Sequence, residues 1–144
     1  MVELKRDRIG NISFSLHDSR VQKITIKEDS LILAVDRIFE YADEDENWYP
    51  CEIEFTKMDP DYCDIKIFSY PYGMEGVNEF TGKNLSLEEF IKEYPAAEFE
   101  IITETYFGHD TVYQGEIWQE GEDPLRAIMS VWNMGDMIYR VDKK

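Results

Sequence analysis

Short stretches in which apolar and polar residues alternate, separated by polar turns, account for most of the chain. The clearest are 20–27, which is rich in β-branched residues, and 30–37, which is almost continuously apolar. Both are typical of strands, and Glu28-Asp29 between them suits a tight hairpin turn. The pattern therefore predicts a β-hairpin whose apolar side chains share one face. In that register the facing pairs are Lys27 with Ser30, Ile26 with Leu31, Ile24 with Leu33 and Gln22 with Val35.

Other segments repeat this alternation and predict further strands. Residues 11–16 alternate strictly, and His17-Asp18-Ser19 after them has the composition of a turn. Three more hairpins are expected from pairs of runs joined by turn residues, namely 51–55 with 63–67, 98–106 with 111–118, and 125–132 with 137–141. In the first of these, Lys66 is expected opposite Glu52 or Glu54.

A single helix is predicted near 86–94. Leu87, Phe90, Ile91 and Tyr94 follow the i, i+3, i+4, i+7 spacing of one helix face. Ser86 with Glu89 reads as a capping box, and Pro95 ends the pattern. So short a helix is not stable alone, and we expect its apolar side to lie on a sheet.

Together these patterns predict a mainly β fold, an antiparallel β-sandwich or partly open barrel of eight or nine strands with one helix. The 144 residues contain no repeat or linker, so we expect one domain over 1–144. A chain of this length can bury a sufficient core without a metal or a disulfide, and no cofactor is expected.

Charge is the most extreme property of the composition. The chain has 31 acidic against 15 basic residues, a formal net charge of -16. This field repels nucleic-acid phosphates and anionic lipid surfaces and attracts a basic protein, although solubility alone is also a reason for acidity. No apolar stretch spans a bilayer and residues 1–8 carry no signal region, so the expected location is the cytoplasm.

Two acidic turns and nearby aromatic rings are the candidate contacts for such a partner. The segment 40–47 is the densest acidic run, and 119–124 is a second acidic turn. The stretch 69–83 mixes aromatic rings with glycines, as expected of a binding loop or of a cap on the core. The predicted contact residues are Asp43, Glu44, Asp45, Glu46, Glu120, Glu122 and Asp123, with Trp48 and Tyr72 as ring anchors.

Metal and catalytic interpretations of local motifs are weak. The acidic run from Asp43 fits part of a calcium-loop pattern, but Trp48 stands where the glycine of the sharp turn is needed. Cys51 and Cys63, the only cysteines, lack zinc-finger spacing with His17 or His109 and read as reduced core residues. His17-Asp18-Ser19 contains the residue types of a catalytic triad, but neighbours on one turn do not form that relay.

Enzymatic activity is not expected. The sequence has no phosphate-cradling glycine loop, no nucleophile elbow and no zinc-binding helix pair. We therefore interpret the protein as a non-catalytic binding protein. The alternatives are a structural interaction domain, or a small-ligand-binding domain whose barrel mouth is lined by Trp118, Tyr113 and Trp132.

The N-terminal quarter also carries a resemblance. The segments 14–24 (FSLHDSRVQKI) and 31–35 (LILAV) resemble the opening of small, acidic bacterial proteins, some of which look like immunity proteins that neutralise a toxin. The resemblance implies a β-rich fold and inhibition by binding, and it supplies no catalytic residues.

Overall fold

The computed structural model describes residues 1–6, 12–41, 47–69 and 81–143. In this part of the chain, eleven strands form one antiparallel sheet, accompanied by an α-helix and a short 3-10 helix. The strands are β1 (Val2–Arg6), β2 (Phe14–Ser15), β3 (Ser19–Lys27), β4 (Ser30–Glu40), β5 (Asn47–Phe55), β6 (Asp64–Phe68), β7 (Gly82–Leu85), β8 (Glu98–Phe107), β9 (Asp110–Trp118), β10 (Leu125–Trp132) and β11 (Met137–Val141). The helices are η1 (Pro60–Tyr62) and α1 (Leu87–Glu93).

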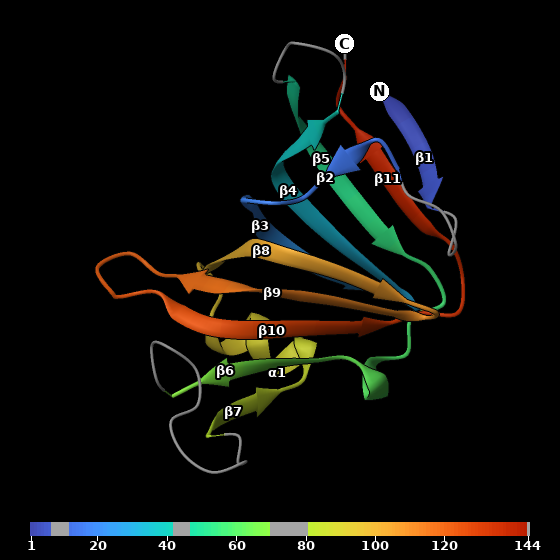
Figure 1. Cartoon of the computed structure of the whole chain (residues 1–144). Coiled ribbons are helices and arrows are strands. Elements are labelled where there is room, and N and C mark those ends of the chain that lie inside the picture. The colour runs from blue at the N-terminus through green and yellow to red at the C-terminus, as the bar shows by residue number, and fades with distance from the viewer. Residues whose placement is uncertain (7–11, 42–46, 70–80, 144) are drawn as a thin grey trace.

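The sheet is open and folded into two halves (Figure 1). The first half-sheet is β1-β11-β5-β4-β3, with β2 beside β4, and the second is β8-β9-β10-β6-β7. They are joined where Ser19–Val21 of β3 pairs with Phe99–Ile101 of β8. A β-bulge follows Val21 on β3 and another follows Ile101 on β8. Because a bulge bends its strand and increases its twist, the two bulges turn the half-sheets toward each other.

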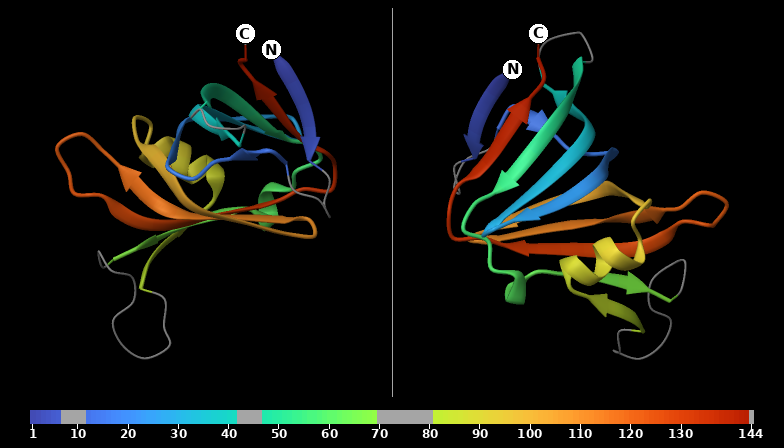
Figure 2. Two further views of the ribbon diagram at one scale, coloured as in Figure 1. Left: turned by 45° about the horizontal axis from the view of Figure 1, so that its top comes forward. Right: turned by 180° about the vertical axis from the view of Figure 1, so that it is seen from behind.

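The half-sheets meet again at the ends of β5 and β10. Met58 and Asn133 form an isolated bridge there, and the Asp59 N–H donates to the Trp132 carbonyl oxygen of β10 at 3.3 Å. The β3–β4 turn also contacts this region, because the Met58 N–H donates to the carbonyl oxygen of Asp29 in that turn at 2.7 Å. Figure 2 shows the half-sheets converging at this end and spreading apart toward the other.

Every second residue on most strands faces the space between the half-sheets and is buried in one common core. Leu31, Leu33 and Val35 do so on β4, and Met129 and Val131 do so on β10. Helix α1 adds buried Leu87 and Phe90 to the same core. The mainly β class and the antiparallel pairing are therefore confirmed, as is the single α-helix among the described residues, and the sheet is not closed.

The hairpin predicted at 20–37 is confirmed over most of its length. Lys27 pairs with Ser30, Ile26 with Leu31 and Ile24 with Leu33. The predicted pair of Gln22 with Val35 is wrong, because the bulge shifts the register and brings Val21 opposite Val35. The shift puts the exposed Gln22 on the outside and buries Val21.

Two of the other predicted hairpins are wrong. Strand β5 pairs with β4 and β11, whereas β6 pairs with β10 and β7. Likewise β10 pairs with β9 and β6, and β11 pairs with β1 and β5. In both places the connection crosses from one half-sheet to the other, so adjacent runs along the chain do not become adjacent strands. Lys66 consequently pairs with Asp64 at 2.9 Å, and Glu54 pairs with Arg140 at 2.8 Å.

The hairpin of β8 and β9 and the cap of α1 are confirmed. Phe107 pairs with Asp110 across a two-residue turn. The Ser86 hydroxyl accepts from the Glu89 N–H at 3.1 Å, and the Glu89 carboxylate accepts from the Ser86 N–H at 3.0 Å. The eleven strands exceed the eight or nine expected, because β1 alternates over only five residues and β7 has a single apolar residue, so neither is recognised from the sequence. The strand predicted over 11–16 is ordered as β2 only at 14–15.

The bulge on β8 depends on a glycine opposite it, which gives a stability prediction. A methyl group added at Gly115 would collide with the carbonyl oxygen of Glu100 on the neighbouring strand. We expect Gly115→Ala to lower the free energy of unfolding by ~3 kcal/mol, measured by urea denaturation. Gly121→Ala, where the added methyl meets nothing within 4 Å but φ is +78°, should cost only about 1 kcal/mol. Equal losses for the two variants would contradict the close approach at Gly115.

Candidate functional site

The predicted contact residues do not converge on one described surface. Positions 43–46 and Tyr72 lie outside the described residues. Glu120, Glu122 and Asp123 are exposed in the turn between β9 and β10. Figure 1 shows this turn at the far left end of the second half-sheet, whereas the β4–β5 end of the first half-sheet, which carries Trp48, lies at the top.

Trp48 is partly covered by the protein itself. The guanidinium carbon of Arg37 lies 4.3 Å from the centroid of the Trp48 ring, and the Phe39 ring lies 5.1 Å away. Phe39 also makes an edge contact with Tyr41, whose side chain is exposed. Trp48 is thus part of an aromatic row on the β4–β5 hairpin that already holds a cation.

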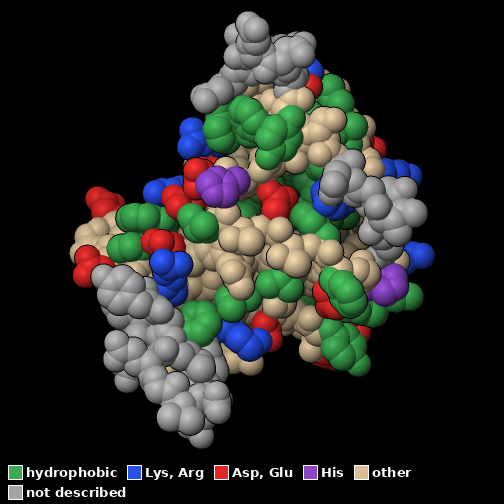
Figure 3. Space-filling view, in the orientation of Figure 1, with side chains coloured by type: hydrophobic (Ala, Val, Ile, Leu, Met, Phe, Trp, Pro, Cys, Tyr) green, Lys and Arg blue, Asp and Glu red, His purple; other side chains and the backbone are tan. Residues whose placement is uncertain are grey.

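A second aromatic group, which the sequence did not reveal, lies where η1 meets the end of β10. The Trp132 ring has two aromatic neighbours, Tyr62 at 5.4 Å and His109 at 5.8 Å, measured between ring centroids. Tyr62 is 67% exposed. We call Tyr62, His109 and Trp132, with the neighbouring Asp61 and Asp110, the Trp132 surface. Figure 3 shows hydrophobic side chains beside a histidine at the right-hand end of the second half-sheet.

Backbone bonds hold η1 against β10 and thereby fix these rings. The Asp59 N–H donates to the Trp132 carbonyl oxygen at 3.3 Å, and the Trp132 N–H donates to Cys63 Sγ at 3.3 Å. The Asp59 carboxylate caps η1 by accepting from the Asp61 N–H at 3.0 Å. Tyr62 is therefore positioned beside Trp132 by hydrogen bonds of the neighbouring main chain and of the Cys63 and Asp59 side chains, before any partner is bound.

Carboxylates surround this group of rings. Asp110 lies directly opposite Trp132 on the neighbouring strand. Burial raises the pKa of the Cys63 thiol, and the charges of Asp59, Asp64 and Asp110 raise it further. Among the described residues, only Asp64 of these three forms an ion pair, with Lys66 at 2.9 Å. The Trp132 surface is thus aromatic and locally anionic.

The interior holds a polar cluster between the half-sheets. The Tyr106 hydroxyl donates to Glu104 Oε1 at 2.7 Å and lies 3.2 Å from the Tyr139 hydroxyl of β11. Glu104 Oε2 accepts from the Leu16 N–H at 2.7 Å. The cluster therefore bonds β8 to the first half-sheet across the core. It also satisfies a partly buried carboxylate that would otherwise be costly.

Burial governs the ionisation of these tyrosines. It raises the pKa of Tyr139 to about 12, although hydrogen bonding to Tyr106 and the charge of Arg6 oppose the rise. Burial likewise raises the pKa of Tyr106 and of Tyr113. All three hydroxyls are thus protonated at neutral pH. Tyr106 and Tyr139 share a hydrogen bond, whereas the buried Tyr113 hydroxyl has no hydrogen-bond partner among the described residues.

Two cavities lie on either side of Arg6 and Tyr106. The Arg6 guanidinium carbon lies 3.6 Å from the centroid of the Tyr106 ring, and both residues line each cavity. One cavity, of about 220 Å³, also has Asp110, Thr111 and Asn133 in its wall. The other, of about 370 Å³, includes Glu104. Among the described carboxylates, none lies within ion-pair distance of Arg6.

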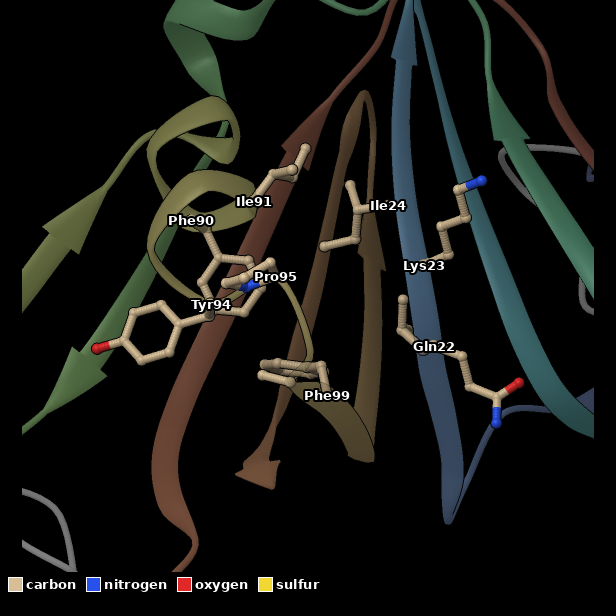
Figure 4. A pocket seen from close by; sticks show the side chains of 10 residues that line it. Gln22, Lys23, Ile24, Phe90, Ile91, Tyr94, Pro95 and Phe99 are labelled. Atoms are coloured by element: carbon tan, nitrogen blue, oxygen red, sulfur yellow. The ribbon is translucent and has the colours of Figure 1, made fainter. Parts of the chain in front are cut away.

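A third cavity, of about 190 Å³, lies between α1 and β3 (Figure 4). Phe90, Tyr94 and Pro95 form one side, Phe99 lies between the two elements, and Gln22 is on the opposite side. Because these side chains are mainly apolar and continue into the core, the groove is best described as the seam along which α1 seals the sheet.

The ligand-binding mouth predicted from Trp118, Tyr113 and Trp132 is wrong. Tyr113 is fully buried and faces the core. Trp118 and Trp132 are partly exposed, because each lies at a strand position that alternates with the buried, core-facing ones. Side chains an odd number of residues apart on a strand point to opposite faces, so Trp118 cannot share a lining with Tyr113. The cavities near Arg6 use other residues.

The cysteines and histidines are not grouped as metal ligands in the described residues. Cys51 and Cys63 are buried free thiols, and burial raises the pKa of Cys51 to about 12. His17 and Asp18 lie 3.1 Å apart on the predicted turn, but Ser19 is fully buried. No group of three or more His, Cys, Asp or Glu is placed to hold a metal ion in the described part of the chain.

Comparisons of the chain with protein-family models, with curated proteins and with solved structures found no match. Among the described residues, no helix could cross a membrane. The surfaces and cavities themselves are therefore the guide to function.

The tyrosine cluster predicts how stability depends on alkaline pH. The folded-state pKa of Tyr139, about 12, lies above the ordinary tyrosine value of about 10, so its contribution is present below pH ~10 and is lost as pH rises toward 12. Tyr139→Phe should cost about 1 kcal/mol at neutral pH, because Tyr106 loses a partner, and should make the alkaline loss shallower. Urea unfolding at several pH values measures both effects. Tyr62→Phe is the control, and an identical pH profile for Tyr139→Phe and the wild type would contradict the assignment.

Proposed function

We propose that the protein is a non-catalytic binding protein that recognises a basic protein partner, in the manner of an immunity-type inhibitor. The observation that carries the proposal is that exposed carboxylates outnumber the basic side chains that could neutralise them. The turn that holds Glu120, Glu122 and Asp123 is exposed, and none of its carboxylates has an ion pair among the described residues.

More than half of the basic side chains in the described residues form ion pairs or lie over aromatic rings. Arg140 pairs with Glu54 at 2.8 Å and with Glu3 at 3.4 Å, and Lys143 pairs with Glu40 at 2.9 Å. Others lie over aromatic rings, as Arg37 lies over Trp48. The field outside the molecule is therefore dominated by the surplus of acidic groups, which speeds encounter with a cationic surface and disfavours nucleic acid.

A cytoplasmic location and the N-terminal resemblance to immunity proteins belong to the same proposal. The buried thiols of Cys51 and Cys63 support a reducing compartment, because neither is paired with the other. Inhibition by binding needs no reactive group.

Charge reversal at the β9–β10 turn tests the proposal. The wild-type protein, used as bait in a lysate of its own cell at low salt, should retain a basic protein that is released at high salt. Replacing Glu120, Glu122 and Asp123 with Lys should weaken binding of that purified protein ~10-fold or more, measured by calorimetry.

The control reverses three exposed carboxylates elsewhere, Glu28, Glu88 and Asp142, and changes the net charge equally. We expect it to weaken binding much less. If both triple variants lose the same affinity, the turn is not a contact site. If no basic protein is retained by the wild type, the proposal fails.

The cavities beside Arg6 favour a second candidate function, binding of a small anionic molecule. A guanidinium without a described carboxylate partner, beside a tyrosine ring and the Thr111 side chain, is suited to a small carboxylic acid. The aspartates in the same wall weigh against a strongly charged anion, so this candidate ranks below the first.

Thermal denaturation with a panel of small carboxylic acids tests this second candidate. A ligand present at about 100 times its Kd should raise the Tm of the wild type by ~5–10 °C. Arg6→Gln should abolish the shift whatever its own Tm, and Lys23→Gln, on an exposed part of β3, should keep it. Wild-type Tm values unmoved across the panel would eliminate this function.

A further inference from the structure

Arginine side chains cover two of the protein's three tryptophans. The Arg20 guanidinium carbon lies 4.7 Å from the Trp118 ring centroid, and that of Arg37 lies 4.3 Å from the Trp48 ring centroid. An indole face attracts a cation because the ring carries negative potential on its faces. Among the described residues, no lysine or arginine lies over the third tryptophan, Trp132.

The surroundings of Trp132 nevertheless suit a cation. Tyr62, which is 67% exposed, places a second ring beside it, and Asp110 lies directly opposite on β9. Asp61 is exposed next to Tyr62. Neither aspartate forms an ion pair among the described residues, so both carboxylates are available to an incoming positive group.

We propose that an arginine side chain of the basic partner binds on the Trp132 surface, over the Tyr62 and Trp132 rings and beside the Asp61 and Asp110 carboxylates. This inference rests on the proposed function and names the place and the residue type by which such a partner binds. The partner's arginine would thus be to Trp132 what the chain's own arginines are to Trp48 and Trp118.

Arginine fits better than lysine for two physical reasons. Its planar guanidinium stacks on aromatic rings, and its several N–H groups can donate to a carboxylate while the plane stays on the ring. Lysine offers a compact, strongly hydrated charge that gains less from a ring face. The main-chain bonds that fix η1 on β10 also reduce the entropy lost when the partner binds.

Nuclear magnetic resonance of the three indole N–H groups tests the proposal on the intact protein. A short oligo-arginine peptide is the probe, and the same peptide with citrulline, which is uncharged but similar in shape, is its control. We expect a saturable shift of the Trp132 signal, smaller shifts of the Trp48 and Trp118 signals, a weaker effect of oligo-lysine and none of the citrulline peptide.

Side-chain variants separate the surface from general charge attraction. Tyr62→Ala removes an exposed ring and should weaken peptide binding ~2- to 5-fold. Asp61→Asn and Asp110→Asn should each weaken it to a similar extent. Tyr41→Ala, which removes a tyrosine that is 64% exposed on the first half-sheet, should leave the affinity unchanged.

Several results would overturn the inference. Equal shifts of all three indole signals, or binding unaffected by Tyr62→Ala, would mean that the peptide binds only through the overall negative charge. Self-association of the protein at the Trp132 surface would identify a second copy, not a basic partner, as its occupant. If Tyr62→Ala binds normally while reversal of Glu120, Glu122 and Asp123 abolishes binding, this inference fails and the proposed function stands. If no cationic probe binds at low salt, both fail.

Discussion

The short pairing of Ser19–Val21 with Phe99–Ile101 is the constraint on which the rest of the structure depends. It is the point where the strand order passes from one half-sheet to the other. Each half-sheet has one apolar face, which a single layer cannot bury. The bulges beside the junction bend both strands, so that the apolar faces turn toward each other and form one core. The bend also determines which polar residues reach the interior.

So few residue pairs cannot hold two half-sheets together alone, and polar contacts reinforce the junction. The bulge after Ile101 changes the parity of β8, so that Glu104 lies opposite Tyr113 on the core side. A carboxylate placed there is tolerable only if it is hydrogen-bonded, and Leu16 and Tyr106 supply those bonds. Tyr106 in turn reaches Tyr139 on the other half-sheet. The polar cluster thus follows directly from the bulge.

The sequence predicts what is local and fails where pairing is distant. The β3–β4 register from Ile24 to Lys27 and the Ser86–Glu89 cap follow from residues within a few positions of each other, and both are confirmed. The hairpins wrongly expected at 51–67 and 125–141 have good alternation and turn chemistry, but alternation reports only which face is apolar and carries no information about the neighbouring strand. The connections that cross from one half-sheet to the other depend on how the whole core packs, which no local segment records.

The candidate surfaces show the same limit. Exposure of Glu120, Glu122 and Asp123 follows from a polar turn and is correctly expected. The pairing of Tyr62 with Trp132 has no local signal, because it requires η1 to be fastened to the end of β10 by main-chain bonds. The clue present in the sequence was the Asp59-Pro60 start of η1, which shows a turn but not its neighbour. The alternation of side chains along a strand could have shown that Trp118 and Tyr113, five residues apart, do not line the same pocket.

The balance of charge links the fold to the proposed activity. With a net charge of -16, every arginine placed over a ring or beside a carboxylate offsets some of the repulsion that the chain otherwise suffers. The molecule uses Arg20 and Arg37 in this way on two tryptophans. At Trp132 the described residues supply the Tyr62 ring and, on the opposite strand, Asp110, but no lysine or arginine over the indole. In the proposed function an arginine of the partner supplies this cation, and because hydrogen bonds already hold η1 on β10, its binding requires no rearrangement of the main chain.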